Sequence, residues 1–350
     1  MKLVNNTGFS AFAFRQYDDT GGLDAVISVR GYYQHRQGTA AVRDEKGDGF
    51  QWQDTFEADP FTSPLICQSD LVPQKPGTDV TFLGESFAGP DDAATWKCKL
   101  ELGPISKELS VSGPRHWIKE TQRSFISHCE RWAIGPAARA SSVPMDWRLT
   151  GGGPVIRAEG PDEQTIDPRN PIGLAYPGVD APEGDYRAPQ ISRSVEGDDT
   201  APAGLGPLAP FWEDRAQHAG TYDDEWTQKR HPLLPHDFDP KFWHCAPPDQ
   251  IAVPYLRGDE AYRLTNLHPE HVCAEGQLPG VDLAVLCENK GGSEWHVLSL
   301  DGVHFDWRDT DRIMLTWRTR FPLPHAALAQ LTLERVTFGD AARLSRADVA

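Results

Sequence analysis

Residues 96–111 read WKCKLELGPISKELSV, and this stretch decides the fold class. Every second residue from Trp96 to Leu102 is apolar, with Lys or Glu in between, which is the period of two of a strand that buries one face. A Gly-Pro pair follows, and the alternation resumes by Val111. The stretch predicts a hairpin or sharply bent strand pair whose charged face suits an exposed or edge position.

Similar strand patterns occur on both sides of this hairpin. In the run from Ile313 to Phe321, the apolar residues Ile313, Leu315, Trp317 and Phe321 fall on one face, and arginines stand between them. A β-branched run over residues 25–29 is predicted to end at Gly31. Together the runs predict a mainly β protein, all-β or α+β. The further runs cover residues 79–84, 283–287, 295–300 and 331–336.

The middle of the chain has a different composition. Residues 144–254 hold 17 of the 29 prolines, with three consecutive glycines near the start. Because proline lacks a backbone donor and fixes φ, we expect an ordered but irregular segment across a β scaffold. The chain is thus predicted to divide into a β-rich portion (1–143), this irregular segment (144–254), a second β-rich portion (255–338) and a tail (339–350).

A short helix is predicted near residues 221–230, one of a few short helices in the chain. Thr221 is the expected N-cap, acidic residues occupy the first turn, and a proline follows the basic last turn. Tyr222, Trp226 and Arg230 are spaced by four and are expected to share one face.

The composition argues for a folded, acidic protein. Of 350 residues, 34 are Lys or Arg and 51 are Asp or Glu, so the formal net charge is −17. This charge repels phosphates, and we expect neither nucleic acid nor a membrane surface as a partner. The six cysteines are too sparse for a disulfide scaffold, and we expect no signal peptide and no membrane span. A cytoplasmic location is the prediction.

The common catalytic motifs for phosphate binding, dinucleotide binding, zinc proteases and α/β-hydrolases do not occur in the sequence. Two histidine clusters, in residues 231–245 and 268–273, lack the spacing of zinc ligands. We therefore predict no metal, no cofactor and no catalytic residue.

An enzymatic alternative rests on three carboxylates. Asp237, Asp239 and Asp249 lie in the proline- and aromatic-rich run HPLLPHDFDPKFWHCAPPDQ, as paired carboxylates do in sugar-processing enzymes. This pattern fits an enzyme that acts on carbohydrate or peptidoglycan. Aspartates beside proline also cap turns by bonding the backbone two residues further on, which is the structural interpretation.

The run GTYDDEWTQKRHPLLPHDFDPKFWHCAPPDQ (220–250), followed by YLRGDEAYRLTNLHPE (255–270), closely resembles the hallmark segment of the domain-of-unknown-function family 2169. Supporting matches are SDLVPQKPGTDV (69–80), RNPIG (169–173) and DTDRIMLTWRTRFPL (309–323). The resemblance covers nearly the whole chain.

The resemblance implies a role in type VI secretion, as a non-catalytic effector adaptor or loading chaperone. Such a protein binds a secreted toxin effector in the cytoplasm and helps to mount it on the VgrG or PAAR spike. The acidic surface is expected to complement a basic toxin. The residues implied for partner contact are Tyr222, Trp226, Arg230, Asp237, Phe238, Asp239, Asp249 and Gln250. The alternative is that these residues fix an irregular loop in place.

Overall fold

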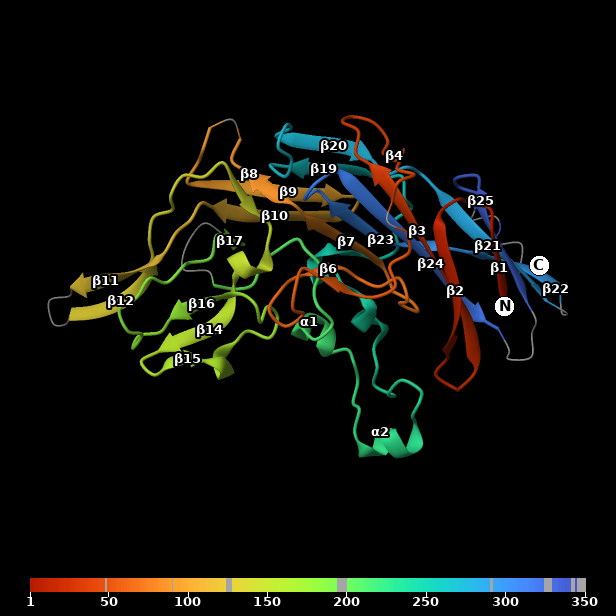
Figure 1. Ribbon diagram of the computed structural model, residues 1–350, viewed down its shortest axis with the longest axis horizontal. Helices are drawn as coiled ribbons and strands as arrows, with labels where there is room; N and C mark the ends of the chain where they lie inside the picture. Colours follow the sequence, from red (N-terminus) through yellow and green to blue (C-terminus); the bar gives the residue numbers. More distant parts are fainter. Residues whose placement is uncertain are drawn as a thin grey trace.

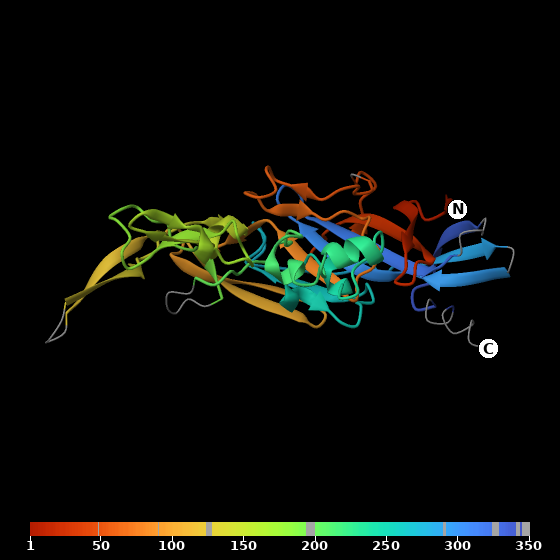
Figure 2. The ribbon, with the colours of Figure 1, turned by 90° about the horizontal axis from the view of Figure 1, so that it is seen from below.

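The computed structural model describes residues 1–47, 49–89, 91–123, 128–193, 200–289, 292–323, 329–340 and 344. In these residues the chain is built mainly of strands, which confirms the predicted fold class. The molecule is elongated, with the β11–β12 hairpin at one end and the sheet that holds β22 at the other (Figure 1). Figure 2 shows the same length from below, with the N-terminus toward the β22 end.

The strands are short and numerous. In chain order they are β1 (Lys2–Asn5), β2 (Ser10–Tyr17), β3 (Leu23–Gln34), β4 (Val42–Arg43), β5 (Thr55–Phe56), β6 (Leu65–Cys67), β7 (Thr78–Leu83), β8 (Glu85–Phe87), β9 (Thr95–Leu102), β10 (Ile105–Ser112), β11 (Trp117–Arg123), β12 (His128–Ile134), β13 (Ser142–Pro144), β14 (Gly151–Arg157), β15 (Gly160–Asp162), β16 (Leu174–Pro177), β17 (Ile191–Ser192), β18 (Ile251–Ala252), β19 (Ala261–Thr265), β20 (Cys273–Gln277), β21 (Asp282–Asn289), β22 (Gly292–Val297), β23 (Ser299–Asp306), β24 (Arg312–Pro322) and β25 (Gln330–Val336).

The helices are short. They are the α-helices α1 (Glu213–Ala216) and α2 (Asp224–Lys229), and the 3-10 helices η1 (Trp147–Leu149), η2 (Glu163–Thr165), η3 (Pro240–Trp243) and η4 (Pro248–Gln250). No helix in the described part of the chain has the length and apolar character needed to cross a membrane. The predicted tail, residues 339–350, lies largely outside the described residues.

The central sheet has the strand order β18-β7-β23-β24-β3-β2, and β4 pairs with β3. β3 continues through Gly31, so the prediction that this strand ends there is wrong. A Cβ at position 31 would lie 3.0 Å from the ring of Phe9 and 3.1 Å from that of Trp317. Glycine is therefore needed at this position for close packing within the strand, and not for a turn.

The two faces of the central sheet differ in character. Ile313, Leu315 and Trp317 lie opposite Tyr33, Gly31 and Val29, and they form an apolar face that belongs to the main core. The predicted sharing of one face by the apolar residues of β24 is confirmed. The other face carries polar residues at the alternate positions of the same strands, because successive side chains point to opposite sides. Among them are Ser28, Arg30, Asp79, Thr81, His304, Thr316 and Arg318.

The predicted hairpin is present as β9 and β10, with Leu102 opposite Ile105 at its turn. It belongs to a five-stranded sheet of order β17-β10-β9-β19-β20, so β9 lies inside the sheet and not at an edge. Its apolar residues, such as Cys98 and Leu100, pack in the core against the apolar face of the central sheet. The hairpin thus closes one side of the core.

Strands from the two ends of the chain are interleaved. β1 pairs with β25 in a four-stranded sheet of order β1-β25-β21-β22, and β3 and β7 pair with β24 and β23 in the central sheet. The two portions that the sequence pattern separates therefore share the same sheets.

The segment 144–254 contains more strand than predicted. β14 lies between β15 and β16 in a small sheet, and its glycines allow the close approach of neighbouring backbone. A Cβ at Gly151 would lie 1.7 Å from the carbonyl oxygen of Thr200, and one at Gly153 would lie 2.4 Å from that of Gly173. The side-chain amide of the fully buried Asn170 fastens this region, because it donates to the carbonyl oxygens of Trp147 and Gly151 and to the Thr150 hydroxyl.

Candidate functional site

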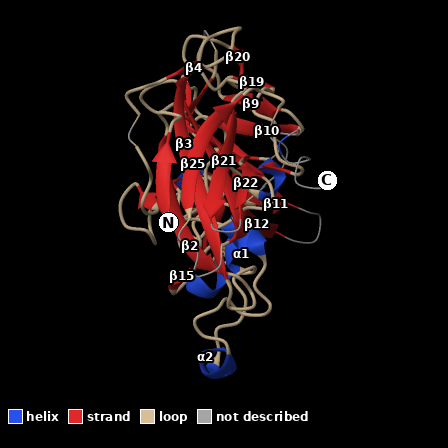
Figure 3. Ribbon diagram, turned by 90° about the vertical axis from the view of Figure 1, so that its right-hand side faces the viewer, coloured by secondary structure: helices blue, strands red, loops and turns tan. Residues whose placement is uncertain are grey.

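Residues 218–239 form a lobe that projects from the body of the molecule, with α2 at its tip (Figure 3). At its base the backbone N–H of Asp239 donates to the carbonyl oxygen of His218 at 3.0 Å, which joins the outgoing and returning chain. We call these residues the projecting lobe. It contains six of the eight residues implied for partner contact, namely Tyr222, Trp226, Arg230, Asp237, Phe238 and Asp239.

The short helix of the lobe is held by its own side chains. Asp223 is the N-cap, and its carboxylate accepts a hydrogen bond from the backbone N–H of Trp226 at 2.8 Å. The prediction of Thr221 as the cap is wrong, because both its backbone N–H and its hydroxyl donate to Asp237. The Arg230 side chain donates to the carbonyl oxygen of Leu234 at 2.6 Å and so closes the end of the helix.

The tip of the lobe presents aromatic side chains. The structure brings Tyr222 and Trp226 together, with their rings edge to face and their centroids 4.7 Å apart. The indole N–H of Trp226 donates to the carbonyl oxygen of Leu233 at 2.8 Å, which orients the half-buried ring. Tyr222 is 52% exposed, so an ordered aromatic pair meets solvent at this place.

Hydrogen bonds that are buried or partly buried fasten the base of the lobe to the body. Arg215, only 3% exposed, donates to the carbonyl oxygens of Leu208 at 2.9 Å and Phe242 at 3.1 Å. On the returning chain, the side-chain amide of Gln68 donates to the carbonyl oxygen of Trp243 at 3.0 Å. Both chain segments that enter the lobe are thus fixed, and its tip is held at a defined place.

Asp249 and Gln250 do not belong to the lobe. The amide of Gln250 donates to the carbonyl oxygens of Val80 at 2.7 Å and Leu205 at 3.0 Å, and its side chain is fully buried. Lys107 donates to Gln250 at 2.9 Å and to Asp249 at 2.7 Å. Gln250 therefore joins segments inside the protein, where a partner cannot touch it.

The three carboxylates of the enzymatic alternative bond separate partners. Asp237 accepts from Thr221, Asp239 accepts from the backbone of Lys241 as the cap of η3, and Asp249 pairs with Lys107. The backbone and side-chain hydrogen bonds from Thr221 lower the pKa of Asp237. This carboxylate is ionised at neutral pH, whereas a general acid needs a raised pKa.

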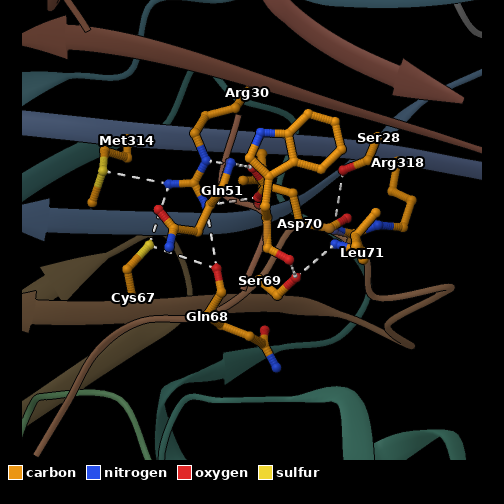
Figure 4. A network of polar contacts seen from close by, with 12 residues as sticks. Ser28, Arg30, Gln51, Cys67, Gln68, Ser69, Asp70, Leu71, Met314 and Arg318 are labelled. Atoms are coloured by element: carbon orange, nitrogen blue, oxygen red, sulfur yellow. Dashed lines mark hydrogen bonds and ion pairs between the residues drawn. The ribbon is translucent and has the colours of Figure 1, made fainter. Parts of the chain in front are cut away.

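A second feature lies beneath the surface, on the polar face of the central sheet. Arg30 donates to both carboxylate oxygens of Asp70, at 2.7 and 2.6 Å, and the two side chains are 4% and 1% exposed (Figure 4). Arg318 forms an ion pair with Asp301 and also donates to Ser28. Asp79 lies on the same face together with its partners Lys75, His244 and Cys245. We call all of these residues the buried charged network.

Asp79 is contacted by three groups of the network. Its carboxylate accepts from Lys75 at 2.7 Å and from the backbone N–H of Cys245 at 2.8 Å, and it lies 2.6 Å from Nδ1 of His244. Burial acts to raise the pKa of Asp79, but Lys75 and His244 outweigh it and hold this pKa well below its usual range. Asp79 is therefore a fixed negative charge inside the protein.

The network leaves little free space. A cavity of about 40 Å³ lies among Arg30, Lys75, Cys67, Cys245 and Arg318. This volume has room for water molecules, whereas pockets for organic ligands measure about 300 Å³ or more. The charges therefore serve to hold chain segments together, with no room for a substrate among them.

The sequence runs that carry the family resemblance meet in this network. Asp70, Lys75 and Asp79 come from the run 69–80, His244 and Cys245 come from the central run, and Arg318 comes from the last run. Sequence reasoning missed the network because its partners are up to 290 positions apart, as in the pair of Arg318 and Ser28. The available signal was the presence of arginines inside otherwise apolar strands.

In the ranges that the structure describes, no three His, Cys, Asp or Glu side chains form a group that could hold a metal ion.

The architecture defines a class, a strand-rich protein with a buried charged network and a firmly based projecting lobe. The model of the family described as "Uncharacterized protein conserved in bacteria (DUF2169)" matches residues 20–318, and the chain belongs to this family. The resemblance noted in the sequence is thus confirmed at the level of the family. Comparisons with curated proteins and with solved structures found no match.

Proposed function

We propose that this protein is a non-catalytic adaptor of type VI secretion. In this proposal it binds a secreted toxin effector in the cytoplasm and assists its loading on the VgrG or PAAR spike. The role comes from the family resemblance of the sequence. The observation that carries it in the structure is the projecting lobe with its exposed aromatic tip.

The construction of the lobe suits protein binding. Tyr222 and Trp226 offer a large apolar area with polar atoms at its edge, which is the composition typical of interface hot spots. Their positions are set by hydrogen bonds within the lobe and by the fixed base. Because little freedom is left to lose, association costs less conformational entropy than it does for a flexible loop.

The buried charged network supports the same proposal indirectly. His244 and Cys245 follow directly after η3 at the base of the lobe, and both bond Asp79 of the central sheet. The network therefore ties the lobe to the largest sheet of the body. This connection fixes the position of the lobe relative to the core of the protein.

The test is capture of the tagged full-length protein from its native host, with identification of co-purifying proteins by mass spectrometry. The proposal expects a toxin effector or a VgrG or PAAR spike protein at a stoichiometric level. Tyr222→Ala is expected to reduce the recovery, since the side chain is exposed and its loss leaves the fold intact. Val179→Ala, at an 87% exposed position outside the lobe, is the matched control.

Two outcomes overturn the proposal. One is that the protein is recovered without any effector or spike protein. The other is hydrolysis of a glycan or of peptidoglycan by the purified protein, abolished by Asp237→Asn or Asp239→Asn, which identifies an enzyme instead.

A further inference from the structure

The exposed aromatic side chains lie in three segments of the chain. Among the described residues, five aromatic side chains are 38% to 71% exposed. They belong to residues 17–24, 44–61 and 211–239, which include the turn after β2, the loop around β5 and the projecting lobe. The five are Tyr17, Trp52, Phe61, Phe211 and Tyr222.

Contacts between the segments show that they are neighbours in space. Trp52 packs on β2, the strand that leads into residues 17–24, because its ring lies edge to face with that of Phe12 at a centroid distance of 4.9 Å. Phe61 and Phe211 have centroids 5.1 Å apart, which places the loop after β5 beside the base of the lobe. A Cβ at Gly21 would lie 3.9 Å from the side chain of Leu233, so the turn after β2 lies beside the lobe itself.

The same segments hold most of the net charge. Within these segments, residues 18–24, 44–47, 49–59 and 213–239 contain 15 acidic and four basic side chains, a net charge of −11 out of −17 for the whole chain. Four of these carboxylates pair with basic side chains from outside the segments, as Asp24 does with Arg320 and Asp239 with Lys241. A net charge of −7 remains on about one seventh of the chain. We call this region the acidic aromatic surface.

We propose that the acidic aromatic surface binds a cationic segment of a partner protein, in which Lys or Arg residues alternate with aliphatic ones. The carboxylates attract the Lys and Arg side chains of the partner, and these cations can also lie over the faces of the aromatic rings. The aliphatic side chains of the partner pack on the exposed rings. Nucleic acids and anionic lipids are repelled by the same charges. The inference rests on the proposed function, because the segment is taken to belong to the effector.

The test uses a fluorescein-labelled synthetic peptide of alternating Lys and Leu, with the full-length protein and fluorescence anisotropy. Lys–Ser and Glu–Leu peptides of equal length are the control probes. We expect the Lys–Leu peptide to bind at least about tenfold more tightly than either control. Raising the salt from about 0.05 to about 0.3 M is expected to weaken binding several-fold, because exposed charges are screened.

Variants locate the site. Trp52→Ala and Tyr222→Ala are each expected to weaken binding of the Lys–Leu peptide about five- to tenfold, and Val179→Ala is expected to leave it unchanged. All three positions are exposed, and an unchanged urea midpoint verifies the fold.

A charge-matched pair of double variants separates this surface from general attraction to an acidic protein. Asp19→Asn/Asp224→Asn and Glu159→Gln/Glu183→Gln raise the net charge equally, at exposed positions on and away from the surface. The first double variant is expected to weaken binding of the Lys–Leu peptide about threefold or more. The loss of affinity in the second double variant is expected to be less than half of the loss in the first. Equal effects of the two, or full binding by Trp52→Ala, overturn the inference.

The outcomes also separate this inference from the proposed function. If an effector co-purifies equally with the wild type and with Trp52→Ala, the adaptor role stands, and the inference that the acidic aromatic surface binds the effector is wrong. If the peptide binds as expected while no effector or spike protein is captured, the surface stands and the adaptor role fails.

Discussion

Replacing Asp70 by Asn tests the buried charged network most directly. Asp70 accepts two hydrogen bonds from Arg30 and a third from the backbone N–H of Gln51 at 2.8 Å. Asparagine keeps the shape, but it removes the charge and turns an N–H donor toward the guanidinium. Arg30, 4% exposed, is then left as a buried cation without its counterion.

The expected loss is large. Removing one partner of a buried ion pair costs about 3–5 kcal/mol, because the remaining charge stays desolvated. An exposed pair of similar distance provides the control. Lys97 and Glu108 lie 2.6 Å apart with side chains 62% and 47% exposed, and Glu108→Gln is expected to cost about 1 kcal/mol or less.

Urea unfolding of the full-length protein at pH 7 measures the difference. With a denaturant dependence of about 3 kcal/mol per M, Asp70→Asn shifts the midpoint down by about 1 M or more. The double variant Arg30→Met/Asp70→Asn removes the unpaired cation, and it is expected to be more stable than Asp70→Asn alone.

A loss below about 1 kcal/mol for Asp70→Asn, equal to that of Glu108→Gln, refutes the reasoning. Such a result means that water reaches Arg30 and that the network does not hold residues 66–72 on the sheet. A double variant less stable than the single one refutes it as well, because the penalty is then not that of an isolated charge.

Three further variants probe other parts of the molecule. Burial lowers the pKa of His304 from 6.5 to about 4, so between these pH values the unfolded chain binds a proton that the folded protein does not, and stability rises with pH across this window. The wild type is expected to lose about 3 kcal/mol more than His304→Gln between pH 6.5 and 4 in urea titrations, and parallel losses contradict this. Asn170→Ala leaves three acceptors without their amide donor and is expected to lower the free energy of unfolding by about 2–3 kcal/mol in the same assay. An unchanged free energy of unfolding means that water replaces the amide. Asp223→Ala removes the cap of α2 and is expected to speed amide hydrogen exchange in the helix about fivefold with an unchanged urea midpoint, and a shifted midpoint shows instead that the lobe supports the body.

Features set by neighbours along the chain could be read from the sequence. The alternation from Trp96 to Leu102 predicts the hairpin, and that of Ile313, Leu315 and Trp317 predicts the buried face of β24, because side chains of a strand point alternately to its two faces. The spacing of Tyr222 and Trp226 likewise places them together near α2.

Where the sequence offers two equally good local arrangements, only the folded structure shows which one forms. Thr221 and Asp223 are both good N-caps, and the cap falls to Asp223 because Asp237, 16 residues away, binds Thr221. Gln250 has the sequence surroundings of a surface turn, and it is buried because the carbonyl oxygens of Val80 and Leu205 converge on it.

The sequence by itself determined the mainly β class, the family, the principal hairpin and the short helix with its aromatic pair, since each depends on local periodicity or on a recognisable run of residues. Only the tertiary structure decided that Arg30 meets Asp70, that His244 meets Asp79, and that three acidic segments with exposed aromatic rings adjoin one another. These contacts depend on strand register and on the path of loops between distant segments. No local pattern encodes them, because a hydrogen bond or an ion pair depends on distance in space and not on separation along the chain.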